Sequence, residues 1–292
     1  MSTPSSQSQA ESGLLLVFAE PGKNVTLEEF HDWYDNEHIP LRTEKFHEFR
    51  SAARYHVPSS VASASRPYTS STWSAIYTIS SLSLLLSDPA YTSLRTNRSE
   101  REAELLGRIG ILDRRIYKLT YDSDVDPKFH STAAERDGGD KSKDDDHHHR
   151  WSTRPTKASE ISPVVIATSV TPAEGNQEAY DEWYLDEHVE ALSKVPGWIR
   201  TRRFELVDAL IVGNDAAPEN ADAKSVPRCL GLHENASPEF SSTPEFAAAL
   251  DTPWRTRIMR EDGSGIVQQE RRVMQLYRAW DPTVALQHPQ SG

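Results

Sequence analysis

One motif, Trp-Tyr-x-x-Glu-His, occurs twice in this chain of 292 residues, at positions 33–38 and again at positions 183–188. The two copies lie about half a chain length apart. Other segments repeat in the same order around them, and Asp-Arg-Arg-Ile at 113–116 is matched by Glu-Arg-Arg-Val at 270–273. A repeat of domain size indicates that one unit has been duplicated, so the chain is expected to contain two copies of one fold.

Each unit reads as strand, helix, strand, strand, helix, strand, from its apolar and alternating runs and its segments of helical periodicity. The first helix is expected to begin after Thr26, which has the capping position, and to end at His38 or Ile39, because the residue before Pro40 avoids helical backbone. Strands are expected near residues 13–19, 49–57, 73–79, 113–121, 164–167, 198–207, 229–233 and 270–277.

The order βαββαβ is that of the ferredoxin-like fold, an antiparallel sheet with both helices on one face. Its other face is bare, and two units in one chain can cover each other by packing sheet against sheet. The sequence therefore predicts an α+β fold of two tandem ferredoxin-like (βαββαβ) domains, residues 13–121 and 163–281, that form one pseudo-symmetric barrel. Residues 122–162 are rich in Asp, Ser, Lys and His and are expected to form a disordered linker.

The formal net charge of −12 argues against nucleic acid or an anionic membrane as a partner, because both are polyanions. No apolar run is long enough to span a bilayer and no secretory signal is evident, so a cytoplasmic location is predicted. Cys229 is the only cysteine, and the acidic and histidine run 144–149 is interpreted as a solvated segment, so no metal site is predicted. A small molecule is the expected partner of a monomer with a pseudo-dimeric core.

The spacing of the first motif places a carboxylate and an imidazole in line with large aromatic residues. The stripe at i, i+3, i+4, i+7, i+8 and i+11 is the face that an amphipathic helix turns to the core. It consists of Phe30, Trp33, Tyr34, Glu37, His38 and Leu41. Buried polar groups need partners. Two interpretations remain open: the pair satisfies loose backbone groups at a helix end, or it borders a ligand cavity.

The two motifs, the Arg54-Tyr55 and Arg203-Phe204 strands and the Arg-Arg-Ile/Val closing strands resemble EthD-like proteins of the dimeric α+β barrel superfamily, especially their tandem fungal form. The resemblance covers both units. It implies an intramolecular dimeric α+β barrel that binds hydrophobic, often aromatic or quinone-like, metabolites between sheet and helices. Relatives include decarboxylases of polyketide anthrone pathways, and more distant barrels include cofactor-free monooxygenases, cyclases and haem proteins.

Without a cofactor, these residues can carry out proton transfer, because an imidazole oriented by a carboxylate takes or gives a proton near neutral pH. The predicted function is a cofactor-independent decarboxylase, cyclase or dehydratase that acts on an aromatic or polyketide-like acid. His38 and His188 are the candidate acid/base groups, with Glu37 and Glu187 as their orienters. The candidate substrate-binding residues are Trp33, Tyr34, Arg54, Trp183, Tyr184, Arg203 and His233.

Alternatives remain open at this stage. The chain could be a non-catalytic small-molecule binder or structural protein, a cofactor-free monooxygenase or a haem protein. His233 competes as the active imidazole but fits a structural role as well, and Arg54 and Arg203 also fit ion pairs. The second copy has Glu190 where Pro40 stands and Phe204 where Tyr55 stands, so one of the two cavities could have become structural.

Overall fold

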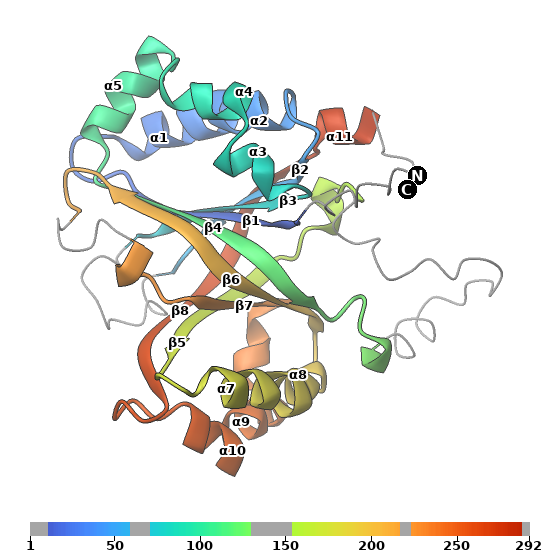
Figure 1. The fold of residues 1–292 in the computed structure, drawn as a ribbon. Coiled ribbons are helices and arrows are strands. Elements are labelled where there is room, and N and C mark those ends of the chain that lie inside the picture. Colours follow the sequence, from blue (N-terminus) through green and yellow to red (C-terminus); the bar gives the residue numbers. More distant parts are fainter. Residues whose placement is uncertain (1–10, 59–70, 130–153, 217–222, 288–292) are drawn as a thin grey trace, which may run out of the picture.

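Eight antiparallel strands close into one barrel (Figure 1). The structure is a computed structural model, and it describes residues 11–58, 71–129, 154–216 and 223–287. The strand order around the barrel is β1-β3-β2-β8-β5-β7-β6-β4. The strands are β1 (Gly13–Glu20), β2 (Phe49–His56), β3 (Trp73–Ile79), β4 (Ile111–Asp122), β5 (Val164–Pro172), β6 (Trp198–Val212), β7 (Cys229–Asn235) and β8 (Ile266–Trp280).

Two seams join the halves of the chain. Strand β4 pairs with β6 and strand β2 pairs with β8, so the first four strands and the last four are each contiguous in the barrel. Both seams are antiparallel, and the β4–β6 seam runs from Leu112 opposite Val212 to Asp122 opposite Arg202. The predicted meeting of the two halves in one barrel is therefore present, and each half depends on the other to cover its inner face.

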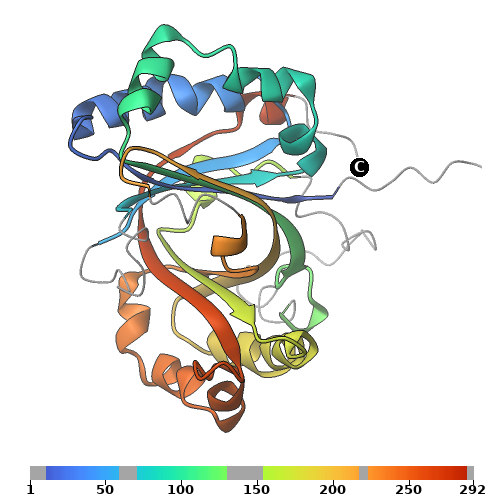
Figure 2. The same cartoon turned by 60° about the vertical axis from the view of Figure 1, so that its left-hand side comes forward.

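Helices cover the outside of the barrel at two opposite ends (Figures 1 and 2). Over the first-half strands lie α1 (Leu27–Trp33), a π-helical turn η1 (Tyr34–His38), α2 (Pro40–Thr43), α3 (Leu82–Leu86), α4 (Pro89–Thr92), η3 (Ser93–Arg95) and α5 (Glu100–Arg108). Over the second-half strands lie α7 (Gln177–Trp183), a π-helical turn η6 (Tyr184–His188), α8 (Val189–Ser193), η9 (Pro238–Ser242), α9 (Pro244–Leu250) and α10 (Pro253–Ile258).

Three short elements complete the described chain: η5 (Ala158–Glu160), η8 (Ala223–Ser225) and α11 (Thr283–Gln287), which lies beside α2. Within the described ranges, no helix has the length and apolar character needed to cross a membrane. The predicted linker is described only at its two ends, and the run 144–149 lies outside the described residues.

Strand β1 is continuously apolar because both of its faces are covered. Leu14, Leu16 and Phe18 belong to the cluster that fills the barrel, whereas Leu15 and Val17 belong to the cluster under the first-half helices. Because successive side chains of a strand point to opposite faces, a strand covered on both faces must be apolar throughout.

Charged side chains inside the barrel connect the halves. The Arg115 guanidinium donates to both carboxylate oxygens of Asp113 on its own strand and to Glu270 Oε2 of β8 at 2.9 Å. All three residues are buried. A buried arginine left without carboxylates would carry a large desolvation cost, so these contacts fix how β4 and β8 sit in the barrel.

The prediction that the first helix ends before Pro40 is wrong. The helical path continues through the π turn η1, and Pro40 is the first residue of α2. In the π turn the amide of Ile39 donates to the carbonyl of Tyr34, five residues back, at 3.1 Å. Proline has no amide hydrogen to lose and is well placed at a first helical position, so the new segment can start there.

Candidate active site

The π turn determines which motif residues face the core. A π turn accommodates one more residue than an α-helical turn, and such turns are frequent at functional sites. The expected stripe is therefore shifted after Tyr34. Ile39, Arg42 and Thr43 are buried, whereas Leu41 and Glu37 are only partly buried. His38 and Arg42, one α turn apart, both line a cavity under the helices.

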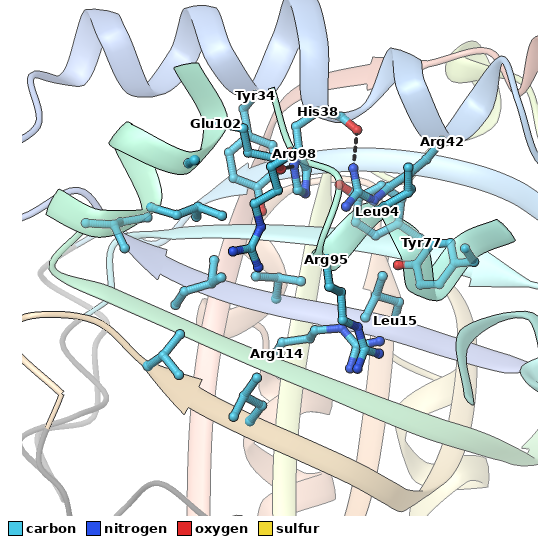
Figure 3. A pocket seen from close by; sticks show the side chains of 18 of the residues that line it. Leu15, Tyr34, His38, Arg42, Tyr77, Leu94, Arg95, Arg98, Glu102 and Arg114 are labelled. Atoms are coloured by element: carbon cyan, nitrogen blue, oxygen red, sulfur yellow. Dashed lines mark hydrogen bonds and ion pairs between the residues drawn. The ribbon is translucent and has the colours of Figure 1, made fainter. Parts of the chain in front are cut away.

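This cavity has a volume of about 440 Å³, within the usual range for small-molecule sites. Its walls are mostly apolar, with Leu15, Val17, Leu106, Ile109 and Leu112 among them. Helices form one wall and strands β1 and β4 the other (Figure 3). Strand β6 of the second half completes the lining with two aliphatic side chains, Leu210 and Val212.

His38 is held at the helical wall by two contacts. Its Nδ1 lies 2.8 Å from Glu102 Oε1, and its carbonyl accepts from Arg42 Nη1 at 2.6 Å. Its ring packs against Trp33, with the centroids 4.5 Å apart. Within the described residues, no protein group is hydrogen-bonded to His38 Nε2. The imidazole is therefore oriented through one nitrogen and offers the other for chemistry.

The electrostatic environment keeps His38 neutral. Burial, reinforced by the Arg42 guanidinium, lowers the pKa of His38 to about 4, although Glu102 acts in the opposite direction. Burial alone would raise the pKa of Glu102, but the bond from His38 brings it below its usual value. At neutral pH, Glu102 is thus a carboxylate that accepts the Nδ1 proton, and Nε2 carries a lone pair. This arrangement is that of a general base.

Two tyrosines stand near this base. The ring centroid of Tyr34 lies 5.0 Å from that of His38, and burial raises the Tyr34 pKa to about 12. Burial likewise holds the Tyr77 pKa well above its usual value, and no described residue is hydrogen-bonded to its buried hydroxyl. Both side chains line the cavity as neutral phenols, so they are hydrogen-bond donors for an oxygen that gains negative charge.

Several predicted residues take other positions in the first half. Glu37 does not reach His38; its carboxylate accepts from Ser99 Oγ, the cap of α5, and lies 3.9 Å from Arg101. The orienting role predicted for Glu37 falls on Glu102, because adjacent helical residues project in different directions. Trp33 is buried in the core behind His38.

Arg54 lies behind Tyr34 rather than among the residues that line the cavity. Its guanidinium carbon is 4.5 Å from the Tyr34 ring centroid, and its Nη1 donates to Asp35 Oδ1 at 2.6 Å. Arg54 therefore supports a cavity residue from the rear.

The second motif is arranged differently. The Tyr184 hydroxyl lies 3.1 Å from His233 Nε2, and His233 Nδ1 lies 3.1 Å from Thr201 Oγ1. Burial lowers the pKa of His233 to about 3. Both ring nitrogens of His233 are thus engaged by hydroxyl groups, and the Tyr184 hydroxyl lies against Gly231, where a Cβ would stand only 2.1 Å away. These contacts fill the space next to the strands.

His188 lacks the carboxylate that His38 has. Its ring stacks on Trp183 with centroids 4.6 Å apart, and within the described chain its buried Nδ1 has no hydrogen-bond partner. Burial lowers its pKa well below the usual value, and His233 and Arg255 act in the same direction.

The remaining second-half candidates make structural contacts. Glu187 accepts from Trp183 Nε1 at 3.0 Å and from the hydroxyl of Thr252 at 2.6 Å. Arg203 pairs with Asp181 and covers the Tyr184 ring, its guanidinium carbon 4.3 Å from the ring centroid.

Comparisons with known proteins identify the fold class. No family model matches the chain, and no curated protein matches it in sequence. An anthrone oxidase-like protein of known structure has a TM-score of 0.51 at 10% identity, with 94% of each chain covered. A monooxygenase candidate from Fusobacterium nucleatum also has a TM-score of 0.51 at 10% identity, covering 93% of this chain and 95% of the other. At such identity the likeness shows the fold alone, a closed barrel of antiparallel strands with helices on its outside.

Proposed function

We propose that the chain is a small-molecule tailoring enzyme in which His38, oriented by Glu102, acts as the general base. The observation that carries this proposal is the 2.8 Å contact between His38 Nδ1 and Glu102 at the wall of a mostly apolar cavity. A neutral imidazole with one nitrogen bound to a carboxylate and the other toward a cavity has the arrangement that proton abstraction needs.

The proposed first step moves one proton. Nε2 takes a proton from an activated C–H or phenolic O–H of the substrate, and the electron pair of that bond remains on the substrate as an enolate or phenolate. The imidazolium that forms is stabilised by Glu102, and the Tyr34 and Tyr77 hydroxyls can donate to the new oxyanion. Return of the proton at another atom would complete a cyclisation, a dehydration or, after loss of carbon dioxide, a decarboxylation.

The apolar lining and the buried aromatic side chains favour an aromatic or polyketide-like substrate. We propose that the reaction needs no cofactor. In keeping with the motifs, we propose that the chain is a tandem EthD-like protein with domains at residues 13–121 and 163–281 and a linker at 122–162. The matching order of strands in the two halves supports this division. The second half then has mainly a structural role.

A cofactor-free monooxygenase is the second candidate, and the pKa of His38 favours it. With a pKa of about 4, His38 is a base rather than an acid at neutral pH, and the electron-rich anion that a base produces is the species that reacts with oxygen. Decarboxylation asks instead for a proton donor, which His38 supplies only after it has taken a proton.

The test is to incubate the protein with a panel of hydroxyaromatic and polyketide acids and to follow mass changes. Loss of carbon dioxide, loss of water and gain of oxygen separate the reaction classes. His38→Gln and Glu102→Gln should lose turnover, whereas His188→Gln should retain it. Binding without turnover across the panel would favour a non-catalytic binder, and a Soret absorption band in the purified protein would favour a haem protein.

A further inference from the structure

The cavity has an excess of positive charge. Arg42, Arg95, Arg98 and Arg114 line it, and among the described residues of its lining Glu102 is the one carboxylate. Glu102 is already engaged by His38. This local balance is opposite to the net charge of −12 of the whole chain. A cavity that concentrates one sign of charge attracts a ligand of the other sign.

Two of these arginines lie close to each other on different elements. Arg95 is the last residue of η3, and Arg114 lies on β4, beside Leu210 of the other half. Burial lowers the Arg114 pKa and the positive charge of Arg95 lowers it further, whereas Tyr91, which also lines the cavity and contacts Arg114, acts in the opposite direction. Figure 3 shows the guanidinium groups of both residues on the strand side of the cavity, with His38 and Glu102 on the helical side.

Apart from the contact of Arg114 with Tyr91, the polar contacts of these two side chains are long. Arg95 Nη2 donates to the carbonyl of Leu85 at 3.4 Å, and Arg114 Nη1 lies 3.5 Å from the half-exposed carboxylate of Asp208. Arg114 Nη2 is buried, and no described residue is hydrogen-bonded to it. A buried guanidinium nitrogen without an acceptor is costly. Arg95 is exposed, so solvent partly screens the repulsion between its charge and that of Arg114. An oxoanion between the two groups would give Arg114 Nη2 an acceptor and would neutralise both charges.

We propose that Arg95 and Arg114 bind an oxoanion carried by the substrate, a carboxylate or a phosphate ester, and that this group is the anchor and not the reacting group. That the bound anion belongs to a substrate rests on the proposed function. The anion site itself rests on the geometry of the two arginines. Guanidinium groups match planar carboxylates and phosphates with paired N–H donors. An acid held at the strand wall places the opposite end of an aromatic ligand toward His38 on the helical wall.

The test compares binding of three probes: hydroxynaphthoic acid, its methyl ester and naphthyl phosphate. Affinities follow from quenching of tryptophan fluorescence in the full chain. The acid should bind tighter than the ester, and Arg114→Gln should weaken the acid by about 10- to 100-fold, the loss of charge-assisted bonds, without changing the ester. If the phosphate binds tighter than the carboxylate, the anchor is a phosphate ester.

Arg271→Gln is the matched control, because Arg271 holds the position of Arg114 in the repeated strand of the second half. If acid and ester bind equally to the wild-type chain, or if Arg271→Gln weakens the acid and Arg114→Gln does not, the anion site is wrong. Circular dichroism shows whether each variant is folded, and Arg95→Gln gives an independent test should Arg114→Gln fail to fold.

The inference and the proposed function fail separately. Acid binding that depends on Arg114 in a His38→Gln background, with no substrate turned over by the wild type, would keep the anion site and remove the enzyme. Turnover that depends on His38 but treats acid and ester alike would keep the enzyme and remove the anchor. For an acid that is turned over, Arg114→Gln should raise KM and leave kcat nearly unchanged.

Discussion

The two halves of the barrel place the same motif in the same helical turn but place a residue of opposite charge near the motif histidine. In both halves the motif glutamate accepts from the capping hydroxyl of a later helix, Ser99 in α5 and Thr252 in α10. Three residues beyond the cap, the first half has Glu102 and the second has Arg255. His38 therefore has a carboxylate partner, whereas His188 has a cation nearby.

This difference shows which part of the motif is structural. The glutamate ties two helices together in both halves, so Glu37 and Glu187 need no chemical role to be where they are. In the proposed function, the group that orients His38 is the residue three positions after the cap, Glu102, which lies outside the motif. The two halves share the helical scaffold, and the carboxylate beside His38, which His188 lacks, is the difference on which the proposed role of His38 as a base depends.

The largest expected effect is on turnover. His38→Gln should reduce kcat by about 10²- to 10⁴-fold, the usual contribution of a positioned general base. His188→Gln, the same change at the matching position, should leave kcat close to that of the wild type. Steady-state kinetics on a substrate found in the panel measure both. Equal losses in the two variants would mean that the halves are equivalent.

Asp35 provides the next contrast, because it belongs to the π turn of His38 and contacts the second half. Its carboxylate accepts from Arg54, from the Tyr277 hydroxyl at 3.2 Å and from Arg278 at 3.2 Å. Asp35→Asn would leave the Arg54 charge buried and unpaired, so the free energy of unfolding should fall by about 3–5 kcal/mol.

Asp32→Asn is the control for this change. Asp32 pairs with Arg101 at the surface, and exposed ion pairs contribute about 1 kcal/mol or less. Chemical denaturation measures both variants, and a similar small loss in each would show that the Asp35 contacts do not join the halves.

The charge exchange can be reversed in the second half. Arg255→Glu places a carboxylate near His188, so the pKa of His188 should rise by about one to three units. NMR titration of the imidazole signals measures it, with the exposed Arg257→Glu as the control. An unchanged His188 pKa would mean that burial alone sets it and that Arg255 is not the counterpart of Glu102.

Stability should respond to acid through the buried imidazoles. The pKa values of His233, about 3, of His38, about 4, and of His188, also lowered, lie below the unfolded value of about 6.5. Their contribution to the free energy of unfolding is therefore present above pH ~6.5 and is lost as the pH falls toward 4. Asp122 acts in the opposite direction. Its raised pKa, about 6, means that the folded chain takes up one proton before the unfolded chain does as the pH falls.

On balance, the free energy of unfolding should fall by up to about 3 kcal/mol per pH unit between pH ~6 and ~4.5. Denaturation at several pH values measures this slope. His233→Asn should reduce this slope, because the lowered pKa of His233 contributes to it. A flat profile between pH 6.5 and 4.5 would contradict the burial of neutral imidazoles.

Sequence reasoning reached the barrel and much of the scaffold. Strand β1 was readable because both of its faces are covered, and the repeat predicted the closure of two halves. The shift after Tyr34 was not readable, because a π turn leaves no periodicity of its own. The sequence therefore predicts Glu37 as the partner of His38, where the structure has Glu102. Glu102 lies 64 residues from His38. It stands three residues after the helix cap Ser99, a position where a glutamate is expected for capping alone, so the sequence does not indicate its contact with His38.

The arginines of the cavity were also missed. Arg95 and Arg98 have helical spacing, and Arg114 alternates with Arg115, which points into the barrel instead. Arg95 and Arg114 come from separate elements that meet at the cavity only in the folded chain, and no local pattern encodes such a meeting.

The most direct measurement of the central claim is exchange of a substrate proton with solvent. The panel of hydroxyaromatic acids is incubated in heavy water, and deuterium incorporation is followed by mass spectrometry for the wild type, His38→Gln and His188→Gln. The account predicts enzyme-dependent incorporation in the wild type and in His188→Gln, and its loss in His38→Gln. Incorporation that survives in His38→Gln, or that disappears in His188→Gln, would contradict it.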